Sequence, residues 1–519
     1  MWQKWKQWQP VAQNENGGKV SWRQMMDNIL KRLLKGTFWS VAATGLSSVF
    51  NLLAGVICAR TLGKEVFGQM GVLQSTVGFV GLLAGLGLGT TATRFVSRYL
   101  LSDPARCGRL LGGILLMAAS TIFAGSLLLL LGARVVAANW LQSPGLETPV
   151  RICAAWVFAL AAGELIMAAL AGLESFRAVA AQSFIRGSLV FVGTVAGLRW
   201  GLEGALVGWS FGLAASGLVL LRVLWRECAR HGIRISYIKS AEDVRSVLGY
   251  ALPTLISGLA SAPFVWFANT IIVRNPGGYE QMALLTVVYQ WRGVFTYLPV
   301  SVSRVVLPLL SSSDTASVSH AGQAFAISNL VNQFVVWGGG IVLLCLSGVL
   351  LSFYGEGFQS GRVAFTLVLG GTMVGFAGNS LGSLILARGL LWLGIAGNLL
   401  TGLSLVVCVL LISHQRGAVA VGIGTMIGYT LNLSLCVTVL TWRKEISAQI
   451  GWRIFGAAMA AVIIVLAMAQ ASPLVAAAAG VLILPASLVA VFQVFAKPEG
   501  FSLSSLLSFT RKSEPRTAV

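Results

Sequence analysis

The chain has 519 residues, of which 56% are hydrophobic and only 10% are charged. Soluble globular proteins are about 25% charged, so this composition excludes an ordinary soluble domain and indicates a polytopic helical membrane protein. The net charge of +20 does not indicate nucleic-acid binding, because most basic residues lie in connections between apolar segments. We therefore expect an all-α fold in a membrane, with lipids rather than nucleic acid as its surroundings.

The residue types that usually hold metals and cofactors are sparse. The seven Cys lie mostly in apolar segments without CxxC spacing, and the three His lie in connections between these segments. The nucleotide-binding pattern GxxxxGK[ST] does not occur, so ATP hydrolysis by this chain is not the energy source. We expect no metal and no cofactor.

The first 35 residues are expected to lie in the cytoplasm. Residues 22–35 carry apolar side chains on one helical face and basic and polar side chains on the other. This pattern predicts an amphipathic helix on an anionic membrane surface.

From residue 37 onward the chain alternates between apolar runs and short connections. A helix needs about 20 apolar residues to cross a bilayer, and fourteen runs meet this requirement approximately. The predicted spans are 37–58, 70–93, 110–133, 150–171, 183–199, 203–221, 247–272, 281–303, 324–351, 363–386, 390–412, 417–441, 454–470 and 473–495. An even number of spans places both termini on the same side.

The basic residues predict the orientation. Of the 37 Lys and Arg residues, 28 fall in segments on the same side as the termini and eight on the opposite side. Because cytoplasmic loops carry the excess of Lys and Arg, both termini are predicted to be cytoplasmic.

Weak internal similarity divides the chain into halves. Gly45-Leu-Ser-Ser recurs as Gly258-Leu-Ala-Ser, Arg60 matches Arg274, and Gly212 matches Gly428, at offsets of roughly 212–216 residues. Six helices per unit give two copies of the same orientation, related by a pseudo-two-fold axis along the membrane normal. The predicted organisation is an N-terminal segment, an N-terminal lobe, a basic linker, a C-terminal lobe, two additional helices and a tail, at residues 1–35, 36–225, 226–246, 247–445, 446–496 and 497–519.

Arg292 is the one basic residue that cannot be placed near a membrane edge. It lies near the middle of the apolar stretch 281–308, where a cation costs roughly 2.5–3.5 kcal/mol on insertion scales. Tyr289 and Thr296 lie one turn on either side and give this helical face a polar stripe. Sites in repeat transporters lie between the halves, so this stripe is the first candidate for substrate binding.

Three stretches resemble a known family. They are ICARTLGKEVFGQMGVLQSTVGFVGLLAGLGLGTTATRFVSRY at 57–99, YALPTLISGLASAPFVWFANTIIV at 250–273 and ILARGLLWLGIAGNLLTG at 385–402. They resemble the polysaccharide-transporter branch of the MOP flippase superfamily, which includes O-antigen and exopolysaccharide flippases of the Wzx type. The resemblance extends over about residues 36–495.

The resemblance implies two six-helix lobes around a cavity that opens alternately to each side. It implies a bacterial inner-membrane protein whose substrate is an oligosaccharide on a polyprenyl diphosphate carrier. The glycan would move from the cytoplasmic to the periplasmic leaflet for polysaccharide biosynthesis, with a polysaccharide polymerase and chain-length proteins as candidate partners. In related lipid II flippases the two extra helices make a groove for the lipid tail.

Further polar residues in the spans are candidates beside Arg292. A guanidinium can hold a diphosphate bidentately, or Arg292 can instead form a structural ion pair with a carboxylate. Glu164 is the only acid well inside a span; it can bind a coupling proton or Na⁺, or pair with Arg292 or another Arg. Arg94 and Arg304 lie at comparable cytoplasmic ends, one per lobe, and either attract the diphosphate or anchor their helices. Asn269 contacts sugar or forms an interhelical hydrogen bond.

Two departures from the family pattern concern ion coupling. Asn269 stands where an acidic residue is often found, and the first span has no acid, with Asn51 as its nearest polar residue. An ion-coupled multidrug antiporter of the same superfamily stays a possible alternative. A polysaccharide polymerase or ligase is the alternative enzyme, although the longest outside segment between spans is only 134–149.

Overall fold

The computed structural model describes residues 45–100, 102–236, 241–311 and 318–496. Every regular element in this part of the chain is a helix, so the predicted all-α fold is confirmed. The amphipathic segment 22–35 and the tail 497–519 lie outside the described residues.

The N-terminal half of the described chain begins with a helix at Gly45–Leu62. It continues with α2 (Lys64–Gly85), α3 (Leu88–Tyr99), α4 (Pro104–Leu131), α5 (Ala133–Val135), α6 (Glu147–Gly172), α7 (Phe176–Gly197) and α8 (Gly201–Arg230).

The C-terminal half contains longer and more interrupted helices. They are α9 (Ala241–Leu259), α10 (Ala262–Val273), α11 (Gly278–Ser311), α12 (Val318–Cys345), α13 (Ser347–Ser352), α14 (Arg362–Ala377), α15 (Asn379–Ala387), α16 (Leu391–Trp442), α17 (Ala448–Gln470) and α18 (Pro473–Val491).

Several predicted spans are broken in the structure. The predicted span 70–93 is divided between α2 and α3 at Leu86 and Gly87, which have φ of 46° and 67°. A side chain at Gly87 would also meet the carbonyl oxygen of Ala251 at 2.8 Å, so both the backbone and the close approach require glycine. The predicted span 247–272 is divided into α9 and α10, with a turn at residues 260–261.

Twelve segments of the described chain are long and apolar enough to cross a membrane. One of them, Arg177–Arg230, holds both α7 and α8. The helix α16 covers the two predicted spans 390–412 and 417–441, with a kink at Arg416 between them. The number fourteen therefore stays a prediction, whereas the polytopic membrane architecture agrees with the sequence.

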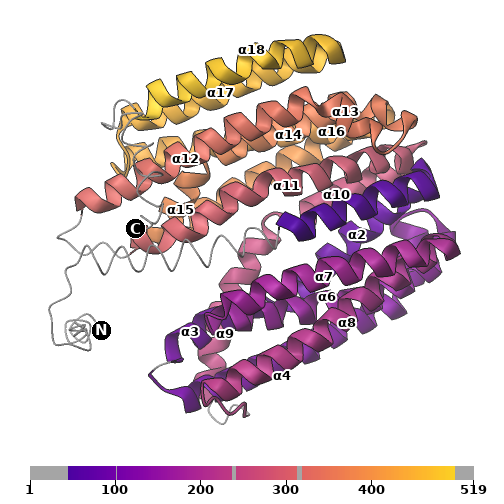
Figure 1. The fold of residues 1–519 in the computed structure, drawn as a ribbon, viewed down its shortest axis with the longest axis vertical. Helices are drawn as coiled ribbons and strands as arrows, with labels where there is room; N and C mark the ends of the chain where they lie inside the picture. The colour runs from indigo at the N-terminus through magenta and orange to yellow at the C-terminus, as the bar shows by residue number, and fades with distance from the viewer. Residues whose placement is uncertain (1–44, 101, 237–240, 312–317, 497–519) are drawn as a thin grey trace, which may run out of the picture.

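The helices form two groups in space (Figure 1). Helices α2 to α8, coloured indigo to magenta, lie together, and α11 to α18, coloured pink to yellow, lie on the other side of the view. The helix at 45–62 and α10 lie between them. The last two helices pack on the outside of the second group, α17 against α14 and α16, and α18 against α12.

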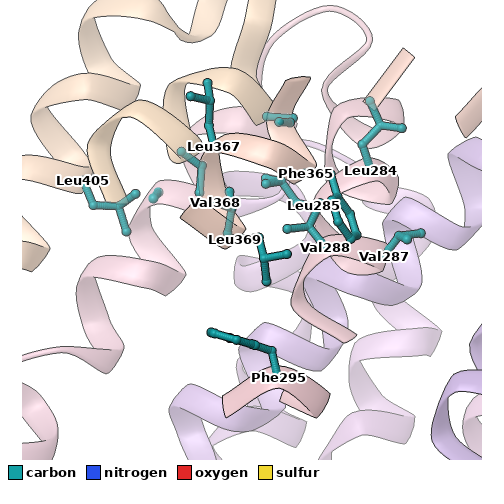
Figure 2. Packing of buried hydrophobic residues seen from close by; sticks show 14 of the residues in the cluster. Leu284, Leu285, Val287, Val288, Phe295, Phe365, Leu367, Val368, Leu369 and Leu405 are labelled. Atoms are coloured by element: carbon teal, nitrogen blue, oxygen red, sulfur yellow. The ribbon is translucent and has the colours of Figure 1, made fainter. Parts of the chain in front are cut away.

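Apolar side chains from α11, α14 and α16 form the centre of the larger buried cluster (Figure 2). Phe365 of α14 and Leu285 of α11 have no exposed surface and lie side by side. In a bilayer such contacts stabilise the fold through van der Waals packing, because lipid tails are as apolar as these side chains.

A smaller cluster belongs to the N-terminal half and includes two residues of α9. Val247 and Ala251 are buried together with residues of α3, α4, α6 and α8. Although the internal repeat assigns α9 to the second half, α9 packs on the first half.

The connection between α8 and α9 also packs on the first half. Ile233 is buried, and the backbone N–H of Ser236 donates to the carbonyl of Gly108 in α4 at 3.3 Å. Glycines at 108 and 112 leave room for this strand-like segment, since a Cβ at either would overlap its backbone.

Candidate functional site

Arg292 lies in α11, four residues after the end of a buried run of seven residues from Met282 to Val288. Its side chain is half-buried, and its Nη2 donates to the hydroxyl of Tyr429 in α16 at 2.7 Å. The guanidinium carbon is 5.9 Å from the centroid of the same ring, within the range of a cation–π contact. Within the described part of the chain, Arg292 takes part in no ion pair.

The partner of Arg292 in this structure is a phenol and not a carboxylate. A carboxylate partner would cancel the charge of the guanidinium, whereas a phenol holds it in place and leaves its charge uncompensated. The guanidinium has five N–H donors, and Tyr429 uses one of them. The side chain is therefore oriented and still able to bind an anion.

Tyr289 lies near Arg292 but makes its hydrogen bond toward α10. Its hydroxyl donates to Oδ1 of Asn269 at 3.2 Å. Asn269 has no exposed surface, and its Nδ2 has no partner among the described residues. In this conformation Asn269 joins α10 to α11 and is closed to a substrate.

The other proposed binding residues have separate surroundings. Thr296 is half-buried, and its hydroxyl donates to the carbonyl of Gly293 at 3.2 Å. Arg94 in α3 is exposed, with its guanidinium carbon 4.1 Å from the ring centroid of Tyr250 in α9. Arg304 belongs to α11, but its side chain lies outside the described residues.

Glu164 pairs with an arginine other than Arg292. Its Oε1 is 2.6 Å from Nη1 of Arg186 in α7, and its side chain is 60% exposed. Of the pairings considered for Glu164, the structure therefore shows the one with another arginine, Arg186 of α7, and not the one with Arg292.

Sequence reasoning missed Tyr429, the partner of Arg292, and Gln290, a second polar residue of α11 that contacts other helices. Gln290 accepts a hydrogen bond from the hydroxyl of Tyr354 at 2.8 Å and lies against Gly55 in the helix 45–62. Tyr429 follows Arg292 by 137 residues. A polar residue in an apolar span, two positions before Arg292, is the available indication for Gln290, whereas a lone Tyr in an apolar span gives none.

The two groups of helices meet through polar contacts at one end of the molecule. Lys64 pairs with Glu280 at 3.3 Å, Arg60 donates to the carbonyl of Phe353 at 2.7 Å, and Tyr279 donates to the carbonyl of Leu141 at 2.8 Å. The sequence predicts that this end faces the periplasm. The described residues include no cluster of three or more His, Cys, Asp or Glu side chains that could hold a metal.

A family described as polysaccharide biosynthesis protein matches residues 33–314, which is more than half of the chain. The chain belongs to this family. This polysaccharide biosynthesis protein is 23% identical over 419 residues to the EPS I polysaccharide export inner membrane protein EpsE of Ralstonia solanacearum, covering 77% of this chain and 89% of that protein. It is 27% identical over 289 residues to the lipid III flippase of Escherichia coli (strain K12), covering 54% of this chain and 65% of that protein.

Solved structures share the fold of this polysaccharide biosynthesis protein. The lipid II flippase MurJ in an inward closed conformation matches with a TM-score of 0.65 at 15% identity, over 87% of this chain and 98% of MurJ. An inward-facing multidrug resistance MATE family transporter of the MOP superfamily matches with a TM-score of 0.58 at 14% identity, over 77% of this chain and 96% of the transporter. The family match over residues 33–314 confirms the resemblance to polysaccharide transporters, and these solved structures share the fold.

Proposed function

We propose that this protein is a flippase for a polyprenyl-diphosphate-linked oligosaccharide in polysaccharide biosynthesis. The glycan moves from the cytoplasmic to the periplasmic leaflet of the bacterial inner membrane by alternating access between two lobes. Membership of the family and the similarity to a lipid III flippase and a polysaccharide export protein support this function.

The observation that carries the proposal is the uncompensated charge of Arg292. A diphosphate offers the planar pairs of oxygens that a guanidinium binds bidentately. Tyr429 holds the guanidinium by one donor and leaves the others for the diphosphate. Arg94 and Arg304 attract the diphosphate toward this site from the cytoplasmic side, and Thr296 offers a further hydroxyl.

The lipid part of the substrate lies against the outside of the second lobe. Helices α17 and α18 present large apolar side chains there, with Trp452 70% exposed, Val481 72% exposed and Leu482 76% exposed. Such surfaces suit lipid tails. Both termini are cytoplasmic in this proposal, and polymerase and chain-length proteins would receive the glycan on the other side.

Substitution of Arg292 tests the function. Charge-assisted hydrogen bonds contribute about 1.5–3 kcal/mol, so Arg292→Ala should lower export roughly 10- to 150-fold and leave the lipid-linked precursor on the cytoplasmic leaflet. Arg292→Lys keeps the charge but loses the planar fork, so export should fall by less. Export is measured as the leaflet distribution of precursor in cells with equal amounts of membrane-inserted protein.

Arg199→Ala is the matched control, because Arg199 is an exposed arginine at the end of α7. It should export normally. Normal export by Arg292→Ala would contradict the binding role. If Arg292→Ala loses drug efflux but exports glycan normally, the multidrug antiporter is favoured. If in Arg292→Ala the precursor reaches the periplasmic leaflet but is not polymerised, the polymerase or ligase is favoured.

A further inference from the structure

A cavity of about 270 Å³ lies within the N-terminal half, apart from Arg292. The helix 45–62, α7 and α8 supply most of its wall. Its lining includes Ser47, Asn51, Ser183, Arg186, Phe191 and Trp209. Asn51 is exposed and the other five are half-buried, so these side chains can reach a ligand.

The cavity is much larger than a single ion or water needs. One water needs roughly 10–15 Å³ by this measure, and small-molecule sites begin at about 300 Å³. A cavity of about 270 Å³ therefore suits a group of the size of one sugar ring.

The charges of the lining favour an uncharged ligand. Arg186 is already paired with Glu164 at 2.6 Å, so the site is close to neutral overall. Arg292 differs, because its partner is a phenol. A diphosphate prefers the uncompensated cation, whereas a neutral polyol can bond to the guanidinium, hydroxyl and amide groups of this lining.

The aromatic walls are held in place by other rings. Phe191 packs on Phe50 at 5.7 Å between centroids, and Trp209 packs on Trp156 at 4.8 Å. Trp156 is buried. Walls that are fixed before binding lose little conformational entropy when a ligand enters, and flat apolar rings suit the C–H faces of a sugar.

One helix extends from the cavity to α11. Ser47, Asn51 and Gly55 follow at four-residue spacing and so lie on one face of the helix 45–62. Ser47 lies against Gly187 of α7, and Gly55 lies against Gln290 of α11, two residues before Arg292. Figure 1 shows this helix, in indigo, between α7 and α11.

We propose that this cavity is a subsite for one uncharged sugar unit of the glycan, while Arg292 holds the diphosphate. The inference rests on the proposed function and deepens it. In this proposal the N-terminal half binds the sugar and the C-terminal half binds the charged carrier.

Two serines of α7 provide a matched pair of variants. Ser183 and Ser188 each donate a hydroxyl to the carbonyl four residues earlier, at 3.0 Å, but only Ser183 lines the cavity. Ser183→Leu and Asn51→Leu fill the cavity with apolar atoms, and Ser188→Leu adds the same volume outside it.

The experiment compares two probes on the purified full chain. One is lipid-linked oligosaccharide extracted from cells that make this protein, and the other is bare polyprenyl diphosphate. Ser183→Leu and Asn51→Leu should weaken binding of the glycan-bearing lipid at least fivefold and leave bare polyprenyl diphosphate unchanged. Ser188→Leu should change neither affinity, and Arg292→Ala should weaken both.

The outcomes distinguish a failure of the subsite proposal from a failure of the flippase proposal. Wild-type affinity of Ser183→Leu and Asn51→Leu for the glycan-bearing lipid would overturn the subsite alone. Equal weakening of both probes would also overturn it, because the cavity would then hold the lipid or the diphosphate. If neither probe binds the wild-type protein, the flippase proposal fails and the subsite fails with it. Circular dichroism and gel filtration of each variant exclude misfolding as the cause.

Discussion

Single glycines set how closely the two groups of helices approach. Gly68 and Gly71 in α2 face α11, and a Cβ at either position would overlap atoms of Tyr279 or Thr286. Small residues at such places let helix backbones come together in lipid, where close packing is the main attraction between helices. The chain has 60 glycines, and the two at the contact between α2 and α11 allow this close approach.

Gly68→Ala should therefore destabilise the protein. The added methyl group meets the backbone carbonyl of Tyr279, which cannot move without shifting α11, and overpacking of this kind costs about 1–3 kcal/mol. Gly78→Ala in the same helix meets nothing within 4 Å and should be neutral or slightly stabilising, because Ala is the better helix former. Thermal unfolding in detergent measures both, and equal melting temperatures would show that α2 and α11 are not held so closely.

Among the helices, α9 has the least expected position. Its Asp243 accepts a hydrogen bond from Nη2 of Arg106 in α4 at 2.9 Å, and its Tyr250 ring lies under Arg94 of α3. The turn at 260–261 separates α9 from α10, which packs against α16 and α2. Contacts of α9 thus tie it to the N-terminal half, although the sequence repeat groups it with the C-terminal half.

Asp243→Asn should loosen this attachment. The Asp243 side chain is 7% exposed and that of Arg106 is 33% exposed, so the pair is partly desolvated. We expect a loss of about 2 kcal/mol in stability, below the roughly 3–5 kcal/mol found when one partner of a fully buried pair is removed. Glu147→Gln breaks the more exposed pair with Arg151 and should cost less than about 1 kcal/mol. A larger loss for Glu147→Gln than for Asp243→Asn in denaturation measurements would contradict this ranking.

For the whole molecule, the decisive question is which end faces the periplasm. The polar contacts of Arg60, Lys64 and Tyr279 close the interface at the end that the charge distribution predicts to be outside. With that orientation the structure represents a state closed toward the periplasm. The orientation rests on the excess of basic residues in the other set of loops.

Single cysteines test this orientation. Gly145→Cys lies in an exposed position where a Cβ meets nothing within 4 Å, on the side predicted to be periplasmic. Ser236→Cys is also exposed but lies on the side predicted to be cytoplasmic. In intact cells a membrane-impermeant thiol reagent should label the first and spare the second, and both should react after permeabilisation. Labelling of Ser236→Cys in intact cells would reverse the topology.

The sequence alone determined the properties that depend on local composition. Apolar runs of about 20 residues gave the all-α membrane fold, because length and hydropathy suffice to identify a helix that can cross a bilayer. The same reasoning found Arg292, since a charge is conspicuous in such a run. The family also followed from local motifs and agrees with the match over residues 33–314.

Only the tertiary structure decided which side chains meet. In lipid, apolar residues cover both the faces that touch other helices and the faces that touch lipid, so hydropathy does not indicate the orientation of a helix. For that reason the sequence could not pair Arg292 with Tyr429, or Glu164 with Arg186, and it could not assign α9 to the N-terminal half. The cavity beside Asn51 has the same origin, because four helices form it and no single segment of the sequence contains its pattern.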